Sequence, residues 1–590
     1  MIKERIAALR KLMKENGVQA YLILSTDPHQ SEYVPELWQR RVWISGFDGS
    51  AGDVVVTTDQ AGLWTDSRYF IQAAEQLNDT GIDLYKLGLP ETPTIAAFIK
   101  THLKKGEKAA IDPRVISFTE AQSLQTQLQS SGIELVFLSE NLVDKLWADQ
   151  PAMPLSPVEV HDIKYAGEEV AGKLTRIRDA MRRLNADTHI LTTLDSIAWT
   201  FNIRSSDIEY NPLTIAYAII NLNEAKLFVK KEKITPELEA HLGTLVHLFD
   251  YDDFAAEIKN ISAKNVIWLD KSTVNQWVVS LLQGTNKIIF NESPVTRFKA
   301  IKNKTELSGF VNSHIRDGAA MVKFFCWLEE AVPLGGVTEL SAAAKLESFR
   351  KELPLFKGLS FETISAYGAH GAIVHYSSSQ ESNVELKPQG IFLLDSGGQY
   401  LDGTTDITRT VTLGEPTAEQ KDRFTRVLKG HIDLALTKFP KGTQGMQLDT
   451  IARKALWDIL ENYGHGTGHG VGSYLGVHEG PQAISYYRGL GVALEAGMIL
   501  SNEPGFYKEG EYGIRIETLV QVVVSKENEN FLEFETATLC PIDLKLVDKS
   551  LMTDAEIKYL NGYHKNVRET LLPLLKDKEQ KWLIENTRAI

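Results

Sequence analysis

The chain has 590 residues, 43% of them hydrophobic, and carries a formal net charge of −14. This size and composition indicate a globular protein of three or four domains at roughly 150 residues per domain. The negative charge is spread along the chain, which argues against a nucleic-acid partner because such proteins need a basic surface.

Two features favour a cytoplasmic protein without a membrane partner. The only cysteines, Cys326 and Cys540, lie in a predicted helix and after a predicted strand, as expected of core thiols in a reducing compartment. The N-terminal residues predict a charged amphipathic helix that lacks the apolar core of a signal peptide, and no run of 18 apolar residues follows.

Residues 1–150 are predicted to form an α/β domain with the order helix, strand, loop and hairpin. The expected elements are Arg5–Asn16, Ala20–Leu24, Val54–Thr57 and Gly62–Thr65. Three prolines between Pro151 and Pro157 favour an extended linker. We therefore place a domain boundary there.

Residues 151–298 are predicted to be a second α/β domain and a diverged copy of the first. The same order of elements recurs, although few residues are identical between the copies. The expected elements are Val170–Leu184, His189–Thr193, Ile197–Phe201, Ile215–Ile220 and Lys226–Val229. Two unrelated α/β domains remain an alternative to this repeat.

A second boundary near Pro294 leads to two further regions, 299–545 and 546–590. A long helix from Thr305 should bury one face of apolar or small residues at helical spacing. That face comprises Leu307, Val311, Ile315, Ala319, Val322 and Phe325. Residues 546–590 carry a capping-box pattern at Thr553–Glu556 and should form a helical extension packed on the preceding domain.

Two aspartates are expected to lie together at one end of a strand pair. Asp395 ends the apolar run Ile391–Leu394, which predicts a buried strand followed by a turn. Asp406 lies in the β-branched segment Thr404–Val411, which predicts a second strand returning beside the first. A hairpin would bring both carboxylates together.

Two glutamates extend this cluster. Glu503 follows the predicted strand Gly497–Asn502 at a point where a proline stops the ladder. In the predicted strand Gly513–Val520, the alternation of side chains puts Arg515 and Glu517 on one polar face.

Divalent metal is the simplest explanation for four converging carboxylates. Without cations they would repel one another and stay partly protonated, whereas two divalent ions would neutralise them and leave His469 as a neutral nitrogen ligand. A single aspartate at a strand end is more often a turn residue, but five such side chains together favour a two-metal site. They are Asp395, Asp406, His469, Glu503 and Glu517.

A glycine-rich loop, Gly464–Gly472, lies between the aspartates and the glutamates. Its glycines allow imidazoles to be aimed with little steric obstruction, and the absence of a Gly-Lys-Ser/Thr ending argues against a phosphate-binding loop. His375, His465 and His478 are three further imidazoles in this region. His375 alone would more often be structural, but together they are candidates for hydrogen bonding to a substrate.

These residues resemble the metal-dependent pita-bread peptidases, the family of methionine aminopeptidase, prolidase and aminopeptidase P, whose ligands follow the order Asp, Asp, His, Glu, Glu. Residues of about 300 to 540 are similar to the catalytic domain, and the preceding residues to the two creatinase-type N-terminal domains of long, cytosolic members. The resemblance implies an α/β (α+β) fold: two creatinase-type α/β domains followed by a curved antiparallel sheet wrapped by two helix pairs, with the carboxylates on its concave face.

The resemblance also implies roles for the site residues. All five predicted ligands match the family's metal ligands, with Asp406 also matching the carboxylate near the substrate amine and Glu517 the one that bridges the metals. Arg515 matches the family's site arginine. The substrate-side histidines correspond to His375, His465 and His478.

A dinuclear, oxygen-rich site predicts hydrolysis, in which a bridging water of lowered pKa attacks a polarised carbonyl. The resemblance implies removal of the N-terminal residue from peptides with proline at the second position. We expect Glu503 to shuttle the proton, and His375 and His478 to steady the tetrahedral intermediate or the proline carbonyl. Carboxylate-rich ligation favours manganese, with zinc or cobalt as alternatives.

Two other functions stay open. A prolidase, which cleaves only Xaa-Pro dipeptides, would share every ligand, although the three-domain length favours an aminopeptidase. A non-catalytic peptide-binding protein would tolerate loss of the ligands, all of which are present. The resemblance further implies a homodimer, in which the N-terminal domains shape access and assembly.

Overall fold

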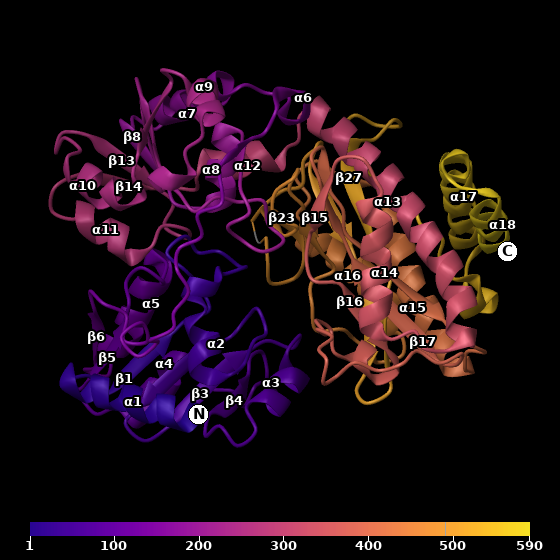
Figure 1. The fold of residues 1–590 in the computed structure, drawn as a ribbon, viewed down its shortest axis with the longest axis horizontal. Helices are drawn as coiled ribbons and strands as arrows, with labels where there is room; N and C mark the ends of the chain where they lie inside the picture. The colour runs from indigo at the N-terminus through magenta and orange to yellow at the C-terminus, as the bar shows by residue number, and fades with distance from the viewer. Residues whose placement is uncertain (490) are drawn as a thin grey trace. The chain divides into compact units, whose positions relative to one another are not determined.

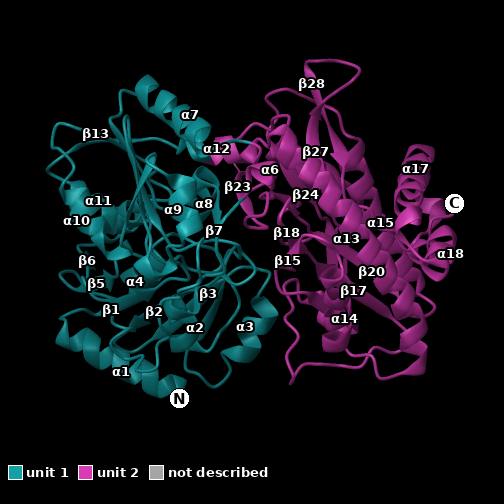
Figure 2. Cartoon of the chain, turned by 45° about the horizontal axis from the view of Figure 1, so that its top comes forward, with its two compact units in different colours: residues 1–161, 168–295 teal, residues 162–167, 296–590 magenta. Residues whose placement is uncertain are grey.

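The computed structural model describes residues 1–489 and 491–590, which form two compact units (Figure 2). Unit 1 comprises residues 1–161 and 168–295, and unit 2 comprises residues 162–167 and 296–590. Figure 1 follows the chain through both units from the N-terminus to the C-terminus. Among the described residues, none of the helices combines the length and the apolar character needed to span a membrane.

The first sheet of unit 1 has six strands in the order β4-β3-β2-β1-β5-β6. Strands β2 and β3 form the predicted hairpin, and β1 pairs antiparallel with β2 but parallel with β5. The elements are α1 (Ile2–Glu15), β1 (Ala20–Ile23), η1 (Glu36–Trp38), α2 (Arg40–Ser45), β2 (Asp53–Thr57), β3 (Ala61–Thr65), α3 (Phe70–Gln76), β4 (Asp83–Lys86), α4 (Ile95–His102), β5 (Lys108–Ile111), α5 (Phe118–Gln129) and β6 (Glu134–Phe137).

The second sheet of unit 1 also has six strands, in the order β12-β11-β10-β8-β13-β14. Residues 151–157 between the sheets form no helix or strand, as the prolines predict. The elements are β7 (Glu159–Val160), α7 (Val170–Arg183), β8 (Thr188–Leu191), α8 (Leu194–Phe201), β9 (Ile203–Arg204), β10 (Tyr217–Asn221), β11 (Ala225–Phe228), α9 (Pro236–Leu242), β12 (Val246–Phe249), η3 (Tyr251–Asp253), α10 (Phe254–Lys259), β13 (Val266–Leu269), α11 (Gln276–Leu282) and β14 (Lys287–Phe290).

The two sheets of unit 1 share one topology. Numbered within its own sheet, each has the strand order 4-3-2-1-5-6, with matching parallel and antiparallel pairs. A common strand order is what a repeat of one domain would produce. In both sheets the second to fourth strands are added on one side of the first strand, and the fifth and sixth strands are added on its other side. This switch falls between β1 and β5 in one sheet and between β8 and β13 in the other.

Unit 2 contains a three-stranded sheet, β16-β17-β20, and a six-stranded sheet, β21-β28-β27-β24-β22-β23. Neighbouring strands in both are antiparallel, as expected. The elements that build the site and its support are α12 (Pro294–Ala300), α13 (Lys304–Ala331), α14 (Glu339–Lys351), β16 (Ile364–Tyr367), η5 (Gly368–Ala372), β17 (Ile391–Ser396), β18 (Gly398–Tyr400), β19 (Gly403–Thr404), β20 (Ile407–Thr412), α15 (Ala418–Leu436), β21 (Phe439–Pro440), α16 (Gly445–Trp457), β22 (Gly468–Gly470), β23 (Glu479–Ile484), β24 (Ile499–Asn502), β25 (Gly505–Lys508), β26 (Tyr512–Arg515), β27 (Thr518–Val524), β28 (Phe531–Thr536), α17 (Asp554–Leu571) and α18 (Asp577–Asn586).

Each of these two sheets is covered by a pair of helices. Helices α13 and α14 pack on the three-stranded sheet, where Leu346 lies in one core with Phe392 of β17. Helices α15 and α16 pack on the six-stranded sheet, where Leu448 lies in one core with Leu500 of β24. Two helix pairs over antiparallel sheet give the expected pita-bread architecture.

The long helix α13 confirms the predicted helix but not its whole predicted face. Val311 is 43% exposed, whereas His314 and Asp317 are buried. The prediction followed one row of apolar side chains, but the polar row beside it is buried because Asp317 Oδ1 accepts a hydrogen bond from Arg350 Nε of α14 at 2.8 Å. The buried face of α13 therefore includes a polar side chain that pairs with α14, and it differs from the face predicted from apolar residues alone.

The C-terminal helix α17 begins after the predicted capping box, in which the Thr553 hydroxyl accepts from the backbone of Glu556. Its Val567 and Leu571 lie in a core with Phe424 of α15. Helix α17 therefore shares a hydrophobic core with α15. Both cysteines are also buried, as expected of core thiols.

Candidate metal centre

Two strand pairs bring the four predicted carboxylates to one place. On β17 and β20, Ser396 pairs with Ile407, so Asp395 and Asp406 flank the end of one antiparallel pair. On β24 and β27, Asn502 pairs with Thr518, and Glu503 and Glu517 are the next residues beyond that pair. A backbone hydrogen bond of 3.1 Å from Glu517 N to Thr408 O joins the two pairs.

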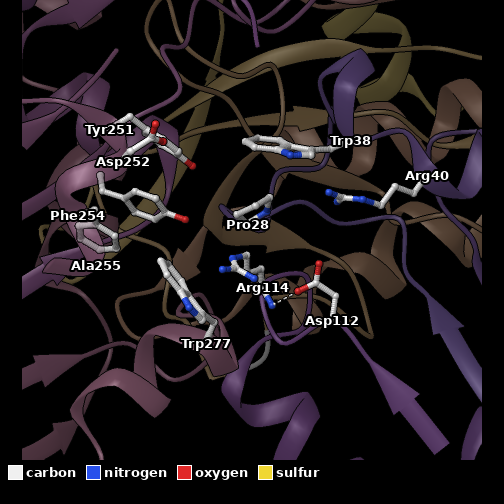
Figure 3. Close-up of a pocket in the computed structure, with 11 residues that line it drawn as sticks. Pro28, Trp38, Arg40, Asp112, Arg114, Tyr251, Asp252, Phe254, Ala255 and Trp277 are labelled. Carbon is white, nitrogen blue, oxygen red and sulfur yellow. Dashed lines mark hydrogen bonds between the residues drawn. The ribbon is translucent and has the colours of Figure 1, made fainter. Parts of the chain in front are cut away.

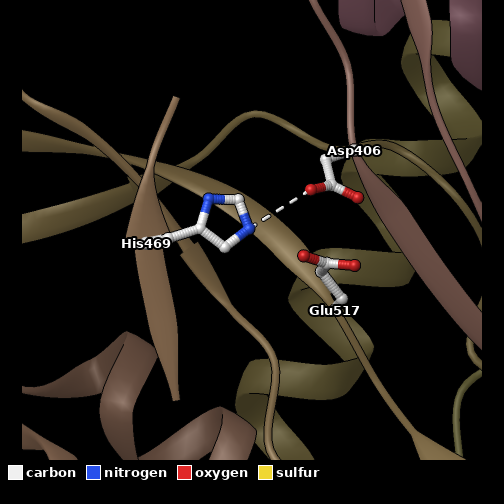
Figure 4. Close-up of side chains that lie close together, drawn as sticks. All are labelled: Asp406, His469 and Glu517. Carbon is white, nitrogen blue, oxygen red and sulfur yellow. Dashed lines mark ion pairs between the residues drawn. The ribbon is translucent and has the colours of Figure 1, made fainter. Parts of the chain in front are cut away.

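Three side chains of this cluster lie close enough to share an ion (Figure 4). Asp406, His469 and Glu517 each offer one ligand atom, and these atoms lie within 4.8 Å of one another. His469 Nε2 is 3.4 Å from Asp406 Oδ2 and 3.6 Å from Glu503 Oε1. The structure therefore brings His469 together with carboxylates from both strand pairs.

The carboxylates of the cluster are buried beside one another. Burial raises the pKa of Asp395 to about 6, and the charge of Asp406 adds to that shift while Arg515 opposes it. Burial and the charge of Asp406 raise the pKa of Glu517 well above its usual value. Asp395 Oδ1 is buried and has no hydrogen-bond partner among the described residues. These are signs of a site that lacks compensating positive charge.

The ring of His469 is oriented by the backbone carbonyl of the next residue. Its Nδ1 lies 2.9 Å from Gly470 O, so Nδ1–H donates to this carbonyl and Nε2 faces the carboxylates. Burial lowers the pKa of His469, but the carboxylates of Asp406 and Glu503 outweigh this effect and raise it to about 9. An imidazole held in this way is suited to binding a cation through Nε2.

Two hydroxyl groups hold the glutamates. Thr408 Oγ1 donates to Glu517 Oε2 at 2.9 Å, and Ser501 Oγ donates to Glu503 Oε1 at 3.1 Å. Ser501 Oγ also accepts from the backbone of His469 at 2.9 Å. Neither residue was predicted from the sequence, although each lies on a strand two positions from a predicted ligand.

Arg515 connects the cluster to a tyrosine that the sequence analysis also missed. Its Nη2 donates to Asp395 Oδ2 at 2.7 Å and its Nη1 to Tyr507 Oη at 2.7 Å. Tyr507 Oη lies 2.8 Å from His465 Nε2, while His465 Nδ1 lies 2.8 Å from Gly466 O. Hydrogen bonds thus run from Arg515 through Tyr507 to His465, which positions the arginine.

The pairing of β25 with β26 is the signal that could have found Tyr507. Gly505 pairs with Arg515 and Tyr507 with Gly513, so Tyr507 is the diagonal neighbour of Arg515 on the same face. A hairpin prediction over these strands would have placed its hydroxyl group beside the arginine.

His478 lies beside the cluster, and its loop is anchored by buried lysines. The rings of His469 and His478 are 4.3 Å apart between centroids, in an edge-on arrangement. The next residue, Glu479, is buried and accepts from Lys302 Nζ, and its Oε2 lies 3.2 Å from Lys299 Nζ. The position of His478 therefore depends on an ion-paired neighbour.

His375 is half-buried and follows η5. The turn before it packs closely on β26, since a Cβ on Gly513 would lie 1.7 Å from the carbonyl oxygen of Gly371. This contact places its segment beside the strand that carries Arg515. A direct contact of His375 with substrate stays a prediction.

Arg409 supports the cluster from behind. Its Nη1 donates to the carbonyl of Glu517 at 2.7 Å, and its Nη2 donates to Tyr563 Oη of α17 at 2.8 Å. The same guanidinium donates to Cys540 O at 2.9 Å. One buried side chain therefore links a predicted ligand with the C-terminal helix.

Three local predictions need correction. The predicted strand over Gly513–Val520 is two strands, and Glu517 lies in the break between β26 and β27, where its backbone N–H turns to Thr408. His469 lies on β22 instead of in a loop, and Asp395 lies within β17 rather than at its end. Pairing with β24 and β20 extends both strands beyond the residues that alternation alone indicates.

Four parts of the chain match known families. Residues 5–146 and 149–306 each match a creatinase/prolidase N-terminal domain. Residues 309–524 match metallopeptidase family M24, and residues 530–590 match the C-terminal region of peptidase M24.

Several proteins are similar to the chain over nearly its whole length. The Arabidopsis thaliana protein aminopeptidase P2 is 43% identical over 100% of this chain and 89% of its own. The Drosophila melanogaster Xaa-Pro aminopeptidase ApepP is 43% identical over 95% of this chain and 93% of its own. The crystal structure of a Caenorhabditis elegans X-prolyl aminopeptidase, described as a cytosolic enzyme with a di-nuclear active site, superposes with a TM-score of 0.96 at 38% identity and covers 100% of both chains.

Proposed function

The chain belongs to the aminopeptidase P group of metallopeptidase family M24 and is an Xaa-Pro aminopeptidase, and we propose that Asp395, Asp406, His469, Glu503 and Glu517 hold the two divalent ions with which it cleaves peptides. Full-length similarity to such enzymes is the observation that carries the function. The cluster of Asp406, His469 and Glu517 supports the ligand assignment.

The side chains of the cluster fit two divalent ions. Four carboxylates match the charge of two such ions, and one imidazole adds a nitrogen donor. The buried Asp395 Oδ1, which has no partner among the described residues, is the kind of oxygen a cation would satisfy. When bound, two divalent ions lower the pKa of a water molecule and stabilise the oxyanion formed on the peptide carbonyl.

We assign proton transfer to Glu503. Burial raises its pKa, which brings the carboxyl group closer to the pH at which a general base works best. Its Oε1 accepts a hydrogen bond from Ser501 Oγ and lies 3.6 Å from His469 Nε2. The Glu503 carboxylate therefore lies at the edge of the cluster. Glu503 would accept a proton from the attacking water and return it to the proline nitrogen that leaves.

The remaining predicted residues would recognise substrate. His478, beside His469, would donate a hydrogen bond to the oxyanion or the proline carbonyl, and His375 would do so from the segment beside β26. Arg515 would orient Asp395. His465 would act through Tyr507, since its Nε2 already meets that hydroxyl group.

Manganese is the metal we propose, because the ligand set is rich in carboxylates. The family resemblance supports a homodimer, and the description of the Caenorhabditis elegans relative as cytosolic supports a cytoplasmic location. Metal analysis of protein purified without added salts and light scattering in solution test the first two of these points.

The ligand assignment is tested by Asp406→Ala and Glu517→Ala. Each should lose bound metal and turnover of a tripeptide with proline at its second position, because each removes charge that only the ions balance. Asp422→Ala, which changes a carboxylate of α15 that pairs with Arg426 at 3.0 Å, is the matched control and should keep both. Full metal content with normal rates in both ligand variants would contradict the assignment.

A prolidase activity is separated from aminopeptidase activity by substrate length. The enzyme should cleave an Xaa-Pro tripeptide as well as a dipeptide, and a chelator should abolish both activities. Cleavage of dipeptides alone would support the prolidase alternative instead.

The N-terminal unit is expected to shape substrate access and assembly. A fragment that begins near Pro294 tests this role. If it folds and cleaves peptides of every length as the full chain does, the unit has no such role.

A further inference from the structure

Unit 1 contains a cavity of about 340 Å³ whose lining includes none of the predicted site residues (Figure 3). Its volume lies within the range of about 300–1,000 Å³ that small-molecule sites occupy. The lining residues come from both sheets of unit 1, with Pro28 and Trp38 from the first repeat and Tyr251 and Trp277 from the second. The cavity is therefore built by the packing of the two repeats.

The cavity lies where α/β sheets commonly bind ligands. In the first sheet, β1 and β5 are adjacent and parallel. Between them the chain switches from adding strands on one side of β1 to adding strands on the other. Pro28 lies in the loop after β1, and Asp112 and Arg114 lie directly after β5. Loops that diverge from the carboxyl ends of two such strands leave a crevice, which is the usual ligand position in this class of sheet.

Arg40 directs a buried donor group toward the cavity. It is 7% exposed, and its Nε and Nη2 donate to the two oxygens of Asp144 at 2.6 and 2.8 Å. Its buried Nη1 has no hydrogen-bond partner among the described residues. Figure 3 shows the guanidinium end directed toward Trp38 and Pro28. A buried guanidinium N–H without an acceptor is costly, so a ligand oxygen at this point would stabilise it.

A rigid aromatic wall faces this donor. Tyr217 and Phe254 stack with ring centroids 3.9 Å apart, and Tyr251 stacks on Tyr217 at 5.1 Å. The Tyr251 hydroxyl lies 2.9 Å from Nε2 of the buried His29, which fixes the ring. These rings cannot rotate freely, so an apolar group could bind against them at little cost in side-chain entropy.

The charges that line the cavity match a zwitterion. Arg40 is balanced by Asp144, and Asp252 is balanced by Lys230, whose Nζ lies 2.6 Å from its Oδ2. The two remaining charged residues, Arg114 and Asp112, have opposite charges. Each Asp112 oxygen already accepts one hydrogen bond, from Arg114 N at 2.9 Å and from Asn141 Nδ2 at 3.1 Å, which leaves a further lone pair on each. A net anion or cation would therefore find no excess of opposite charge, whereas a zwitterion finds one partner for each end.

We propose that this cavity binds a free α-amino acid with an apolar or aromatic side chain. Its carboxylate accepts from Arg40 Nη1, its ammonium group donates to Asp112, and its side chain packs against Trp38, Phe254 and Trp277. The site does not use any residue of the metal centre, and its existence does not depend on which peptides the enzyme cleaves.

Calorimetric titration of the full-length protein with L-phenylalanine tests the proposal. We expect saturable binding, and binding at least about tenfold weaker for N-acetyl-L-phenylalanine amide, which keeps the side chain but has neither charge. Arg40→Met should weaken L-phenylalanine binding by a similar factor. Ala255→Phe, which fills the cavity from α10 without removing a polar contact, should abolish it.

Two controls locate the site. Ala240→Phe, at an exposed alanine of α9 outside the cavity, should bind like the unmodified protein. Asp406→Asn, measured in the presence of a chelator, should also bind L-phenylalanine. An amino acid that bound only at the metal centre would no longer bind under these conditions. Absence of saturable binding, unchanged binding in Ala255→Phe, or loss in Asp406→Asn would overturn the proposal. If Arg40→Met does not fold, Ala255→Phe decides.

Discussion

Replacing Lys302 with methionine should destabilise unit 2 and slow turnover. Lys302 is 4% exposed, and its ammonium group donates to Glu479 Oε1 and, at 2.7 Å, to the carbonyl of Lys299. Glu479 is itself 5% exposed, and Lys299 Nζ remains 3.2 Å from its Oε2. Breaking a buried ion pair lowers the free energy of unfolding by about 3–5 kcal/mol. Because Lys299 still pairs with Glu479, we expect Lys302→Met to lower it by about 3 kcal/mol.

The effect is measured by thermal unfolding and by steady-state kinetics on one preparation. A change of 1 kcal/mol shifts the Tm of a large domain by about 2 °C, so the Tm of unit 2 should fall by about 6 °C. Because Glu479 follows His478, the loop should also shift. Misplacement of a catalytic group by about 1 Å can cost about 10²-fold, so kcat should fall by up to that factor while KM changes little.

Two further variants separate this cause from a general loss of stability. The double variant Lys302→Met with Glu479→Gln also removes the carboxylate that pairs with the buried Lys299, so its Tm should fall below that of Lys302→Met. Lys304→Met, at an exposed lysine that begins α13, should leave both Tm and kcat unchanged. An unchanged Tm in Lys302→Met, or a double variant that is more stable than Lys302→Met, would refute the argument from buried charge.

Four other outcomes are expected. Glu503→Gln should lower kcat by about 10²–10⁴-fold with a near-normal Tm, and near-native turnover at full metal loading would remove its role in proton transfer. His478→Ala should keep its metal and fold but lose about 10²–10³ in kcat with a modest change in KM; a lowered Tm with an unchanged rate would instead mark a structural histidine. Tyr507→Phe should cost about 1–3 kcal/mol, because it leaves an N–H of the buried Arg515 without its acceptor, and an unchanged Tm would contradict this role. The pKa of Asp395 is raised to about 6, so this group favours the folded, metal-free protein at low pH and loses that contribution as the pH rises through about 6. The Tm of chelated protein should therefore fall from pH 4 to 7 relative to Asp395→Asn, and a parallel pH dependence of the two proteins would contradict the shift.

Local sequence patterns predicted most of the elements that carry the site. Alternation in the segment around Arg515 put that residue and Glu517 on one side, and both side chains contact the Thr408 hydroxyl group, although the strand is interrupted between them. Alternation reports only which side of the backbone a residue faces, and it does not report where a strand exchanges one partner for another. The break at Glu517 arises from such an exchange, since its backbone bonds to β20 rather than within its own sheet.

Residues that act through distant partners could not be predicted in this way. Tyr507 and Lys302 lie eight and 177 positions from the groups they bind, Arg515 and Glu479. Lys302 carries no local signal, because a lysine after a helix is common, and Tyr507 could be found only by predicting the pairing of β25 with β26. Their roles appear only when the fold brings their partners to them, and the same is true of the cavity between the two repeats.

Arg409 makes the proposed ligand Glu517 and helix α17 depend on each other. Its planar fork reaches the Glu517 carbonyl on one side and the Tyr563 hydroxyl on the other, a span that a lysine with its single ammonium group could not make. Substitutions that repack α17 would therefore alter the stiffness of the backbone that carries Glu517, although none of them touches a ligand. A genetic screen for changed metal affinity should for this reason recover variants in the last helices as well as in the sheets.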